Sequence, residues 1–484
     1  MSESTAVETV APNPSSRIDL WLGAILFISI GIRVLIAQEG VRFWPDENRY
    51  EVSRVAASQI LENKWNAAAG NLLTKADHMG YKIMMVLPAI GQMTWGWSDG
   101  SMALLGSGLP STLNILLVYL LARRLGGGMF EARWAALLMA CSVSMTYWSR
   151  HLMPYDMALF WGLASLYIGV RRTTCWWESF LVGLLGLGSF LTYNGNWLMV
   201  AWVLVAHVLL GLPSLLGLLI RGFFAALGFL GCFIGLALIT SFYDYYLIAA
   251  YMGFSGTISQ GDFSEGHLVL WSYLWAGERG LLVLFLAALA FFMAVVIRSP
   301  RHVDLRSWIW FSGLVVIAAG LVVFSNFLEK FVVYGRLVRL MIPFLALLGG
   351  WSINRCLPPT AGSTRWMALF SVLVIGLASP NFVQPLRQSF PLEFFQRCVA
   401  FIHREVEGAP DDEKYRDRLR RHRVLFATSI WPYPETPALP AHDVLLRQPH
   451  PIQFEPYLYE GYNRSQREAM MGMDISMRLI VPKN

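Results

Sequence analysis

Apolar stretches of about 17 to 25 residues recur along this chain from Leu20 to about Phe382, and each is long enough to cross a lipid bilayer as a helix. Hydrophobic residues make up 55% of the 484 residues and charged residues only 14%, which excludes an ordinary water-soluble domain. A segment in lipid must satisfy its own backbone hydrogen bonds, and an α-helix does so. The sequence therefore predicts an all-α polytopic membrane protein.

The number and direction of the spans follow from hydropathy and from arginine in the short loops. Hydropathy predicts about eleven spans, near residues 19–37, 103–122, 132–148, 155–170, 177–193, 197–212, 219–240, 280–297, 308–325, 338–354 and 366–382. Short loops with pairs such as Arg123 and Arg124, or Arg171 and Arg172, then fall on one side, which the positive-inside rule assigns to the cytoplasm. The segment 38–102 and everything after residue 382 face outward.

Three regions follow from this topology. Residues 1–18 carry no cationic leader and are predicted to form a short cytosolic tail, residues 19–382 the transmembrane domain, and residues 383–484 a periplasmic soluble domain. Helix-like and strand-like patterns predict that the last region is a small α/β domain.

The first outer loop is predicted to hold interfacial helices. Residues 47–62 place Val52, Val55, Ala56 and Ile60 on one face, which is typical of an amphipathic helix at the membrane surface. Residues 81–97 are predicted as a half-buried interfacial helix, because counting them as a span would move the Arg123 loop outside.

Several other classes of function find little support. The five cysteines show no CxxC spacing, so neither a disulfide framework nor a zinc site is indicated. A net charge of +6 does not indicate a nucleic-acid partner. No duplicated halves with matching broken spans are visible, which weakens a transporter interpretation without removing it.

Acidic residues gather in the predicted outer loops. The stretch "RFWPDENRYEVSR" holds Asp46 and Glu47, the same loop later holds Asp77 and His78, and the turn "SRHLMPYD" ends on Asp156. A single acid at an interface is more often structural, for example in an ion pair with a neighbouring arginine. Several acids on one face favour a functional site.

Cations are predicted to meet these acids at the outer boundary. Arg33 lies near the outer end of the first span, where it either snorkels to the surface or serves a site inside the membrane. Lys330, Arg336 and Arg339 precede a later span at the same side. Carboxylates and cations at headgroup depth predict a site where an anionic lipid headgroup reacts.

The chemistry of such a site has few requirements. A sugar on a polyprenyl phosphate already has a good leaving group, which needs only a cation to hold its charge. A carboxylate would deprotonate or orient the acceptor. Asp46 at a helix N-terminus is stabilised as the anion by roughly 0.3–1 kcal/mol, which favours a base. No cofactor is required, and a divalent cation held by paired acids stays open.

Four stretches carry a resemblance to a known family. "WPDENRYEVSRVAASQILENKW" resembles the opening motif of the bacterial members of the dolichyl-phosphate-mannose protein mannosyltransferase superfamily, GT-C glycosyltransferases that include the lipid A aminoarabinose transferases. "LPSTLNILLVYLLARRLGG", "TYWSRHLMPYDMALFWGLASLYI" and "GRLVRLMIPFLALLGG" are similar to later motifs of that family, in the same order. The resemblance covers most of residues 20–355.

The resemblance implies roles for individual residues. It makes Asp46 the catalytic carboxylate, Glu47 its partner and Asp156 a second acid facing the acceptor. It matches Arg339 to an arginine of the family's later motif. The remaining candidates for the donor phosphate are Asp77 and His78, which stand where the family has an acid followed by Lys or His, with Lys75, Lys82 and His267 as further cations or imidazoles.

The sequence thus predicts a GT-C glycosyltransferase of the bacterial inner membrane. It would transfer a monosaccharide, with inversion, from a polyprenyl-phosphate donor to a lipid, glycan or protein acceptor at the outer face. A relative of the eukaryotic mannosyltransferases that open with "HPDE" is a close alternative. A transporter or flippase of a lipid-linked sugar is the alternative from another class.

Overall fold

The computed structural model describes residues 19–37, 49–74, 76–171, 175–212, 214–258, 266–328, 335–356 and 364–387. Within these ranges every regular element is a helix. The predicted cytosolic tail and residues 388–484 of the predicted α/β domain lie outside them, so both stay predictions.

Six helical segments of the described chain are long and apolar enough to cross a membrane, and each coincides with a predicted span. Leu20–Ala37 is α1, Glu278–Arg298 lies within α16 (Gly266–Arg298), and Leu305–Phe327 includes α17 (Leu305–Val322). Asp99–Arg124 includes α6 (Asp99–Ala103) and α7 (Leu109–Arg124), and Leu215–Ser241 includes α13 (Leu215–Ala226) and α14 (Cys232–Ser241). Arg336–Cys356 includes most of α18 (Gly335–Val338) and all of α19 (Ile342–Cys356). The total of eleven crossings stays a prediction.

The other five predicted spans are also helical. They correspond to α8 (Met129–Ala140) with α9 (Val143–Tyr147), α10 (Tyr155–Gly169), α11 (Trp176–Thr192), α12 (Trp197–Leu209) and α20 (Thr364–Arg387). The stretch 132–148 is not one continuous helix, because Ser142 interrupts it and accepts a hydrogen bond from the backbone of Met145 as the cap of α9.

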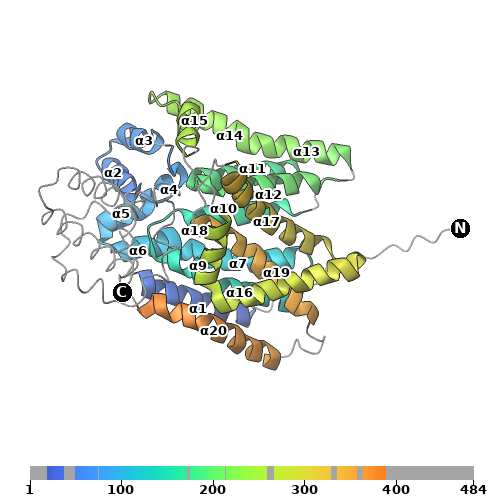
Figure 1. Ribbon diagram of the computed structural model, residues 1–484. Helices are drawn as coiled ribbons and strands as arrows, with labels where there is room; N and C mark the ends of the chain where they lie inside the picture. The colour runs from blue at the N-terminus through green and yellow to red at the C-terminus, as the bar shows by residue number, and fades with distance from the viewer. Residues whose placement is uncertain are drawn as a thin grey trace, which may run out of the picture.

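The long helices lie side by side as a bundle (Figure 1). The helices α13 and α14 run along one long edge, and α1 and α20 run along the opposite edge. Large apolar side chains on α13, such as Leu215, Leu219 and Phe223, are exposed, as suits a surface that faces lipid. In contrast, the Arg336–Cys356 segment is almost wholly buried and forms the centre of the core.

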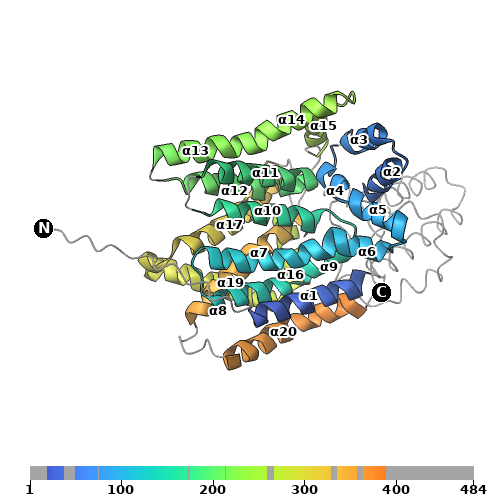
Figure 2. The same ribbon diagram turned by 180° about the vertical axis from the view of Figure 1, so that it is seen from behind.

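The described residues 49–95 of the predicted first outer loop form short helices gathered at one end of the bundle, at the right in Figure 2. They are α2 (Arg49–Leu61), α3 (Trp65–Leu73), α4 (Met79–Met84) and α5 (Val86–Trp95), while α15 (Leu247–Ile258) approaches the same end. The ten residues of α5 rise only about 15 Å, which is too short to cross a hydrocarbon core of about 30 Å.

The buried face of α2 differs in part from the predicted one. Ala56 is buried and packs with Val52 and Ile60, as expected, but Val55 is 48% exposed. Tyr50 and Ala57 are buried in a second cluster on another side of the helix. The predicted apolar face is therefore only partly used for packing, because α2 packs against α3 and α5 at once.

Three central helices share one direction and so define two ends of the molecule. The N-terminal ends of α7, α10 and α19 meet where Asp156 and Arg339 lie, which we call the site end. Arg124, Val170 and Arg355 lie at or just beyond their C-terminal ends, which we call the arginine end. The fifteen residues of α10 rise about 20 Å from one end to the other.

Candidate functional site

A buried ion pair stands at the centre of the site end. Asp156 lies in the first turn of α10, and Arg339 begins the 3-10 turn that leads into α19. The Nη2 group of Arg339 donates to Oδ1 of Asp156, and each side chain is 1% exposed. Two residues that the sequence predicted separately, as an acceptor-facing acid and a phosphate ligand, therefore contact each other.

Arg33 joins this pair from α1. Its Nη2 donates to Ser111 Oγ at 2.8 Å, and its Nη1 donates to the carbonyl oxygen of Ser29 at 3.1 Å and also to Ser29 Oγ. Arg33 is 0% exposed and interacts electrostatically with both Asp156 and Arg339. The snorkelling alternative for Arg33 is therefore wrong, because the guanidinium is held inside the bundle.

The three side chains form a cluster with two cations and one carboxylate, and its hydrogen bonding is incomplete. Nε of Arg33, Nε and Nη1 of Arg339 and Oδ2 of Asp156 are buried without a hydrogen-bond partner in the described part of the chain. Buried polar atoms normally have partners, so such atoms call for an explanation. Guanidinium donors at this depth are suited to oxygen atoms of a phosphate.

Polar side chains of α7 and of the π-helical turn before it position the cluster. The amide of Asn114 donates to the backbone carbonyl of Asp156 at 2.9 Å, and Ser111 Oγ donates to the carbonyl of Met145 at 3.0 Å. Ser107, in the π turn Leu104–Gly108, lies within 2.8 Å of the carbonyls of His151 and Met153. The end of α10 that bears Asp156 is thus fastened to α7.

Arg336 lies beside this cluster and is partly exposed. Its Nη1 donates to Tyr155 Oη at 2.8 Å, and its guanidinium lies over the ring of Tyr155, 5.4 Å from the ring centroid. A second ring, that of Tyr193, has its centroid 6.0 Å away. Since Tyr155 precedes Asp156, Arg336 reaches the same end of α10 as Arg339.

Aromatic contacts connect His78 to this group. The His78 and Tyr193 rings are stacked, with centroids 5.2 Å apart and planes inclined by 8°. His78 Nδ1 lies 2.6 Å from Oδ1 of Asp77, the neighbouring acid predicted with it. The structure therefore brings Asp77, His78 and Arg336 to the two tyrosines.

The other residues that the sequence predicted for the site lie in different places. Lys82 is 2% exposed, one helical turn after His78, and its carbonyl accepts a hydrogen bond from Ser53 Oγ at 2.8 Å. His267 is exposed at the start of α16 and contacts Asn326, whose Nδ2 lies 2.6 Å from His267 Nδ1. Asp46, Glu47, Lys75 and Lys330 lie outside the described residues.

Glu278 is a buried acid at the site end that the sequence analysis did not select. It is 1% exposed, and its carboxylate accepts hydrogen bonds from Ser142 Oγ at 2.7 Å and from the backbone of Ser144 at 3.0 Å and Val143 at 3.2 Å. A carboxylate here satisfies the free N–H groups at the start of α9. The signal in the sequence was a lone acid at the edge of an apolar stretch.

No group of three or more His, Cys, Asp or Glu residues within the described ranges is arranged to hold a metal ion. Asp46 and Glu47 are not among those residues, so the predicted option of a divalent cation stays open.

The fold that carries this site is the GT-C fold. It is similar to a solved structure of ArnT from Cupriavidus metallidurans in the apo state, with a TM-score of 0.50 and 14% sequence identity, over 95% of this chain and 77% of that chain. ArnT is a lipid A aminoarabinose transferase with a GT-C fold, so the predicted GT-C fold is confirmed, while the number of spans and the C-terminal domain stay predictions. At 14% identity, the similarity shows the fold alone.

Two further solved structures are similar at lower scores. ArnT from the same organism bound to undecaprenyl phosphate has a TM-score of 0.47 and 16% identity, over 86% of this chain and 74% of that one. The oligosaccharyltransferase AglB from Archaeoglobus fulgidus, in complex with an inhibitory peptide and a dolichol-phosphate, has a TM-score of 0.45 and 14% identity, over 95% and 68%. No protein-family model and no curated protein matches the sequence.

Proposed function

We propose that this protein is a membrane glycosyltransferase. It transfers a monosaccharide, with inversion, from a polyprenyl-phosphate donor to a lipid, glycan or protein acceptor. The site end faces the outside of the cytoplasmic membrane, as the arginine-rich loops at the other end favour. The fold supports the class of enzyme, and the cluster of Arg33, Asp156 and Arg339 supports a site for a phosphate-bearing substrate.

One packed cluster supports the proposal, because it joins a residue shortly after Asp46 in the chain to the residue that follows Asp156. The cluster contains Ala37 at the end of α1, Tyr50 in the first turn of α2 and Met157, the residue after Asp156. Asp46 precedes Tyr50 by four residues, and four extended residues span at most about 14 Å. The short chain between the two residues therefore supports the proposal that Asp46 acts near Asp156.

The roles in the reaction follow from charge and exposure. Asp46 deprotonates or orients the acceptor group. The acceptor then attacks the anomeric carbon of the donor sugar, and the polyprenyl phosphate leaves from the opposite face of the sugar. Arg336 is partly exposed and is the better placed of the two arginines to bind that phosphate from outside. Arg339, which the resemblance matches to an arginine of the family's later motif, is engaged by Asp156 and reaches the phosphate only through its free Nε and Nη1 groups.

Replacing Asp46 with Asn tests this function. A strain that lacks the protein should accumulate the polyprenyl-phosphate sugar and lose the glycan that receives it, and the wild-type gene should reverse both changes. Asp46→Asn keeps the size of the side chain but removes the proton acceptor, which typically costs about 10²- to 10⁴-fold in rate. The variant should therefore leave the donor accumulated, as measured by mass spectrometry of the lipid extract.

Glu62→Gln is the matched control, because it removes an exposed carboxylate just after α2 that pairs with Lys64 and Ser58. It should restore donor consumption fully at equal protein level. If Asp46→Asn also restores it fully, catalysis by this motif is excluded. A deletion strain whose lipid-linked sugar accumulates only on the cytoplasmic side of the membrane would instead support the transporter.

A further inference from the structure

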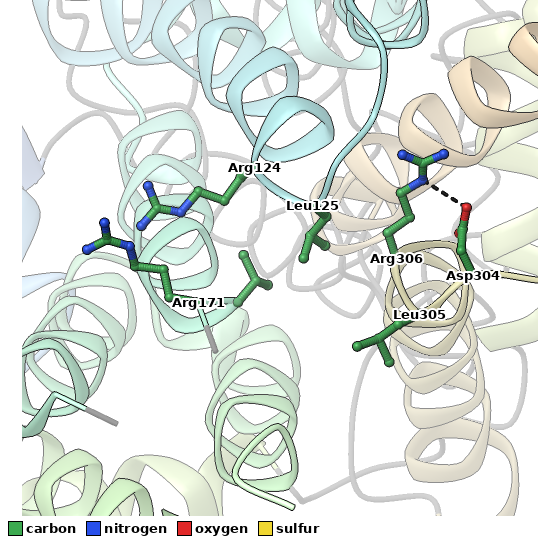
Figure 3. Close-up of a pocket in the computed structure, with 7 residues that line it drawn as sticks. Arg124, Leu125, Arg171, Asp304, Leu305 and Arg306 are labelled. Carbon is green, nitrogen blue, oxygen red and sulfur yellow. Dashed lines mark ion pairs between the residues drawn. The ribbon is translucent and has the colours of Figure 1, made fainter. Parts of the chain in front are cut away.

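A pocket of about 870 Å³ lies at the arginine end, away from the site described above (Figure 3). It opens between the end of α7, the end of α10 and the start of α17, and it is lined by Arg124, Leu125, Val170, Arg171, Asp304, Leu305 and Arg306. Val170 follows the last residue of α10, whereas Asp156 lies in its first turn, so about 20 Å of helix separates this pocket from the ion pair.

Two of the arginines line the same side of this pocket. The guanidinium of Arg124 lies over the ring of Tyr167, 4.3 Å from the ring centroid, and its Nη1 donates to Tyr167 Oη at 3.0 Å. Arg171 lies two residues beyond the end of α10 and lines the same pocket. Figure 3 shows the side chains of Arg124 and Arg171 extending in the same direction.

These two guanidinium groups differ in how they are neutralised. Arg171 forms an ion pair with Glu178, which fixes its position. Arg124 has no carboxylate partner among the residues that the structure describes; its hydrogen bond and its ring contact are both with Tyr167. A stacked and hydrogen-bonded arginine is held in place, and its remaining N–H groups stay available to an anion.

The opposite side of the pocket carries a third cation. Arg306 lies 3.1 Å from Asp304 and 3.2 Å from Glu131, while Leu125 and Leu305 supply apolar surface between the two sides. Leu305 is 41% exposed, so its side chain is accessible from outside the protein. The pocket therefore combines fixed guanidinium groups with an apolar floor.

We propose that this pocket binds the phosphate group of an anionic ligand, with the phosphate bridging Arg124 and Arg171. Arginine binds phosphate oxygens through paired N–H donors, and basic pockets between membrane helices are suited to anionic lipid headgroups. The shared chemistry fits the headgroup of a phospholipid or free phosphate, and the apolar floor is suited to the part of a lipid next to its headgroup. The inference does not depend on the proposed transferase activity.

The test measures binding by the purified full-length protein in detergent. Native mass spectrometry during titration with phosphatidylglycerol gives an affinity for wild type, Arg124→Gln and the control Arg54→Gln. Arg54 is an arginine of the site end that pairs with Glu51, so the control removes the same charge elsewhere. Loss of a charge-assisted contact should weaken binding about tenfold or more in Arg124→Gln, with a change of less than about twofold in the control.

Two further arms identify the source of the phosphate and guard against misfolding. Inorganic phosphate that raises the melting temperature of wild type but not of Arg124→Gln indicates free phosphate as a ligand; an effect of the phospholipid alone indicates a headgroup. Arg124→Lys keeps the charge without the planar fork and should bind with intermediate affinity. Equal affinity of wild type and Arg124→Gln for phosphatidylglycerol, with no response of either protein to inorganic phosphate, would overturn the proposal.

Discussion

At the site end, one carboxylate, that of Asp156, faces the two guanidinium groups of Arg33 and Arg339, and all three side chains are at most 1% exposed. At the arginine end, Asp304 is paired with both Arg306 and Arg355, and it stays one-third exposed. The second arrangement suits a helix end at a membrane surface. The first carries excess buried charge, which is costly for stability and is explained more readily by function.

This difference between the two ends predicts which charged residues are tolerant of substitution without a large loss of stability. When one partner of a buried pair is removed, the other charge stays buried without a counter-charge. When one partner of a partly exposed pair is removed, water solvates the remaining charge at little cost. The following changes test whether the two ends differ in this way, from the largest expected effect to the smallest.

Asp156→Asn should be the most damaging change. It leaves Arg33 and Arg339 facing each other without a counter-charge, and breaking a buried pair typically costs about 3–5 kcal/mol. We expect a large fall in the melting temperature of the detergent-purified protein and a low yield.

The double variant Asp156→Asn with Arg339→Met is the control for this effect, because it removes the pair and not one partner. It should be more stable than Asp156→Asn alone. A double variant that loses the sum of the two single effects would show that the charges are not coupled.

Arg336→Gln should act on substrate and not on stability. Arg336 is partly exposed, and it contacts Tyr155 through a hydrogen bond from Nη1 and through the ring beneath its guanidinium. Losing a charged contact to phosphate costs roughly 1.5–3 kcal/mol, so the KM for the lipid donor should rise about tenfold or more. Tyr155→Phe keeps the ring and should raise it less; equal donor KM in wild type and Arg336→Gln would place the phosphate elsewhere.

Glu131→Gln should have the smallest effect, and one that depends on pH. Glu131 lies in the first turn of α8, and burial raises the pKa of its carboxyl to about 7, although Arg306 opposes this shift. Between an unfolded pKa near 4.5 and this value, the folded protein binds more protons than the unfolded chain, so wild-type stability falls as pH rises.

Gln does not ionise and avoids this loss. The melting temperature of wild type should therefore drop relative to Glu131→Gln between pH 5 and pH 8, by the equivalent of about 1–2 kcal/mol. A difference between the two proteins that is constant over this range would show that Glu131 does not titrate there.

The helices were predictable because the length of an apolar stretch is a local property. All eleven predicted spans contain helix, and the fold class inferred from the motifs is the one observed. The break at Ser142 was not predictable in the same way, because it depends on the carboxylate of Glu278, 136 residues away in the chain.

The sequence predicted which residues belong to the candidate site better than it predicted which of them contact each other. Sequence position placed Asp156 and Arg339 at one end of the bundle, but their contact joins residues 183 apart and depends on how α10 and α19 pack. The contact of Arg33 with Ser29 follows from the spacing of one helical turn, whereas its contact with Ser111 requires the fold. His267 was selected by residue type alone and contacts Asn326 in the structure.

The π turn Leu104–Gly108 makes this part of the chain sensitive to insertions and deletions. In the turn, the N–H of Leu109 bonds to the carbonyl of Leu104, five residues back, so one residue more is accommodated than in an α-helix. Deleting one residue there would restore the ordinary pitch but rotate α6 by about 100° relative to α7. Met102 would then leave its packed cluster while Ser111 stayed with Arg33, so substitutions in this segment should accumulate more readily than changes in its length.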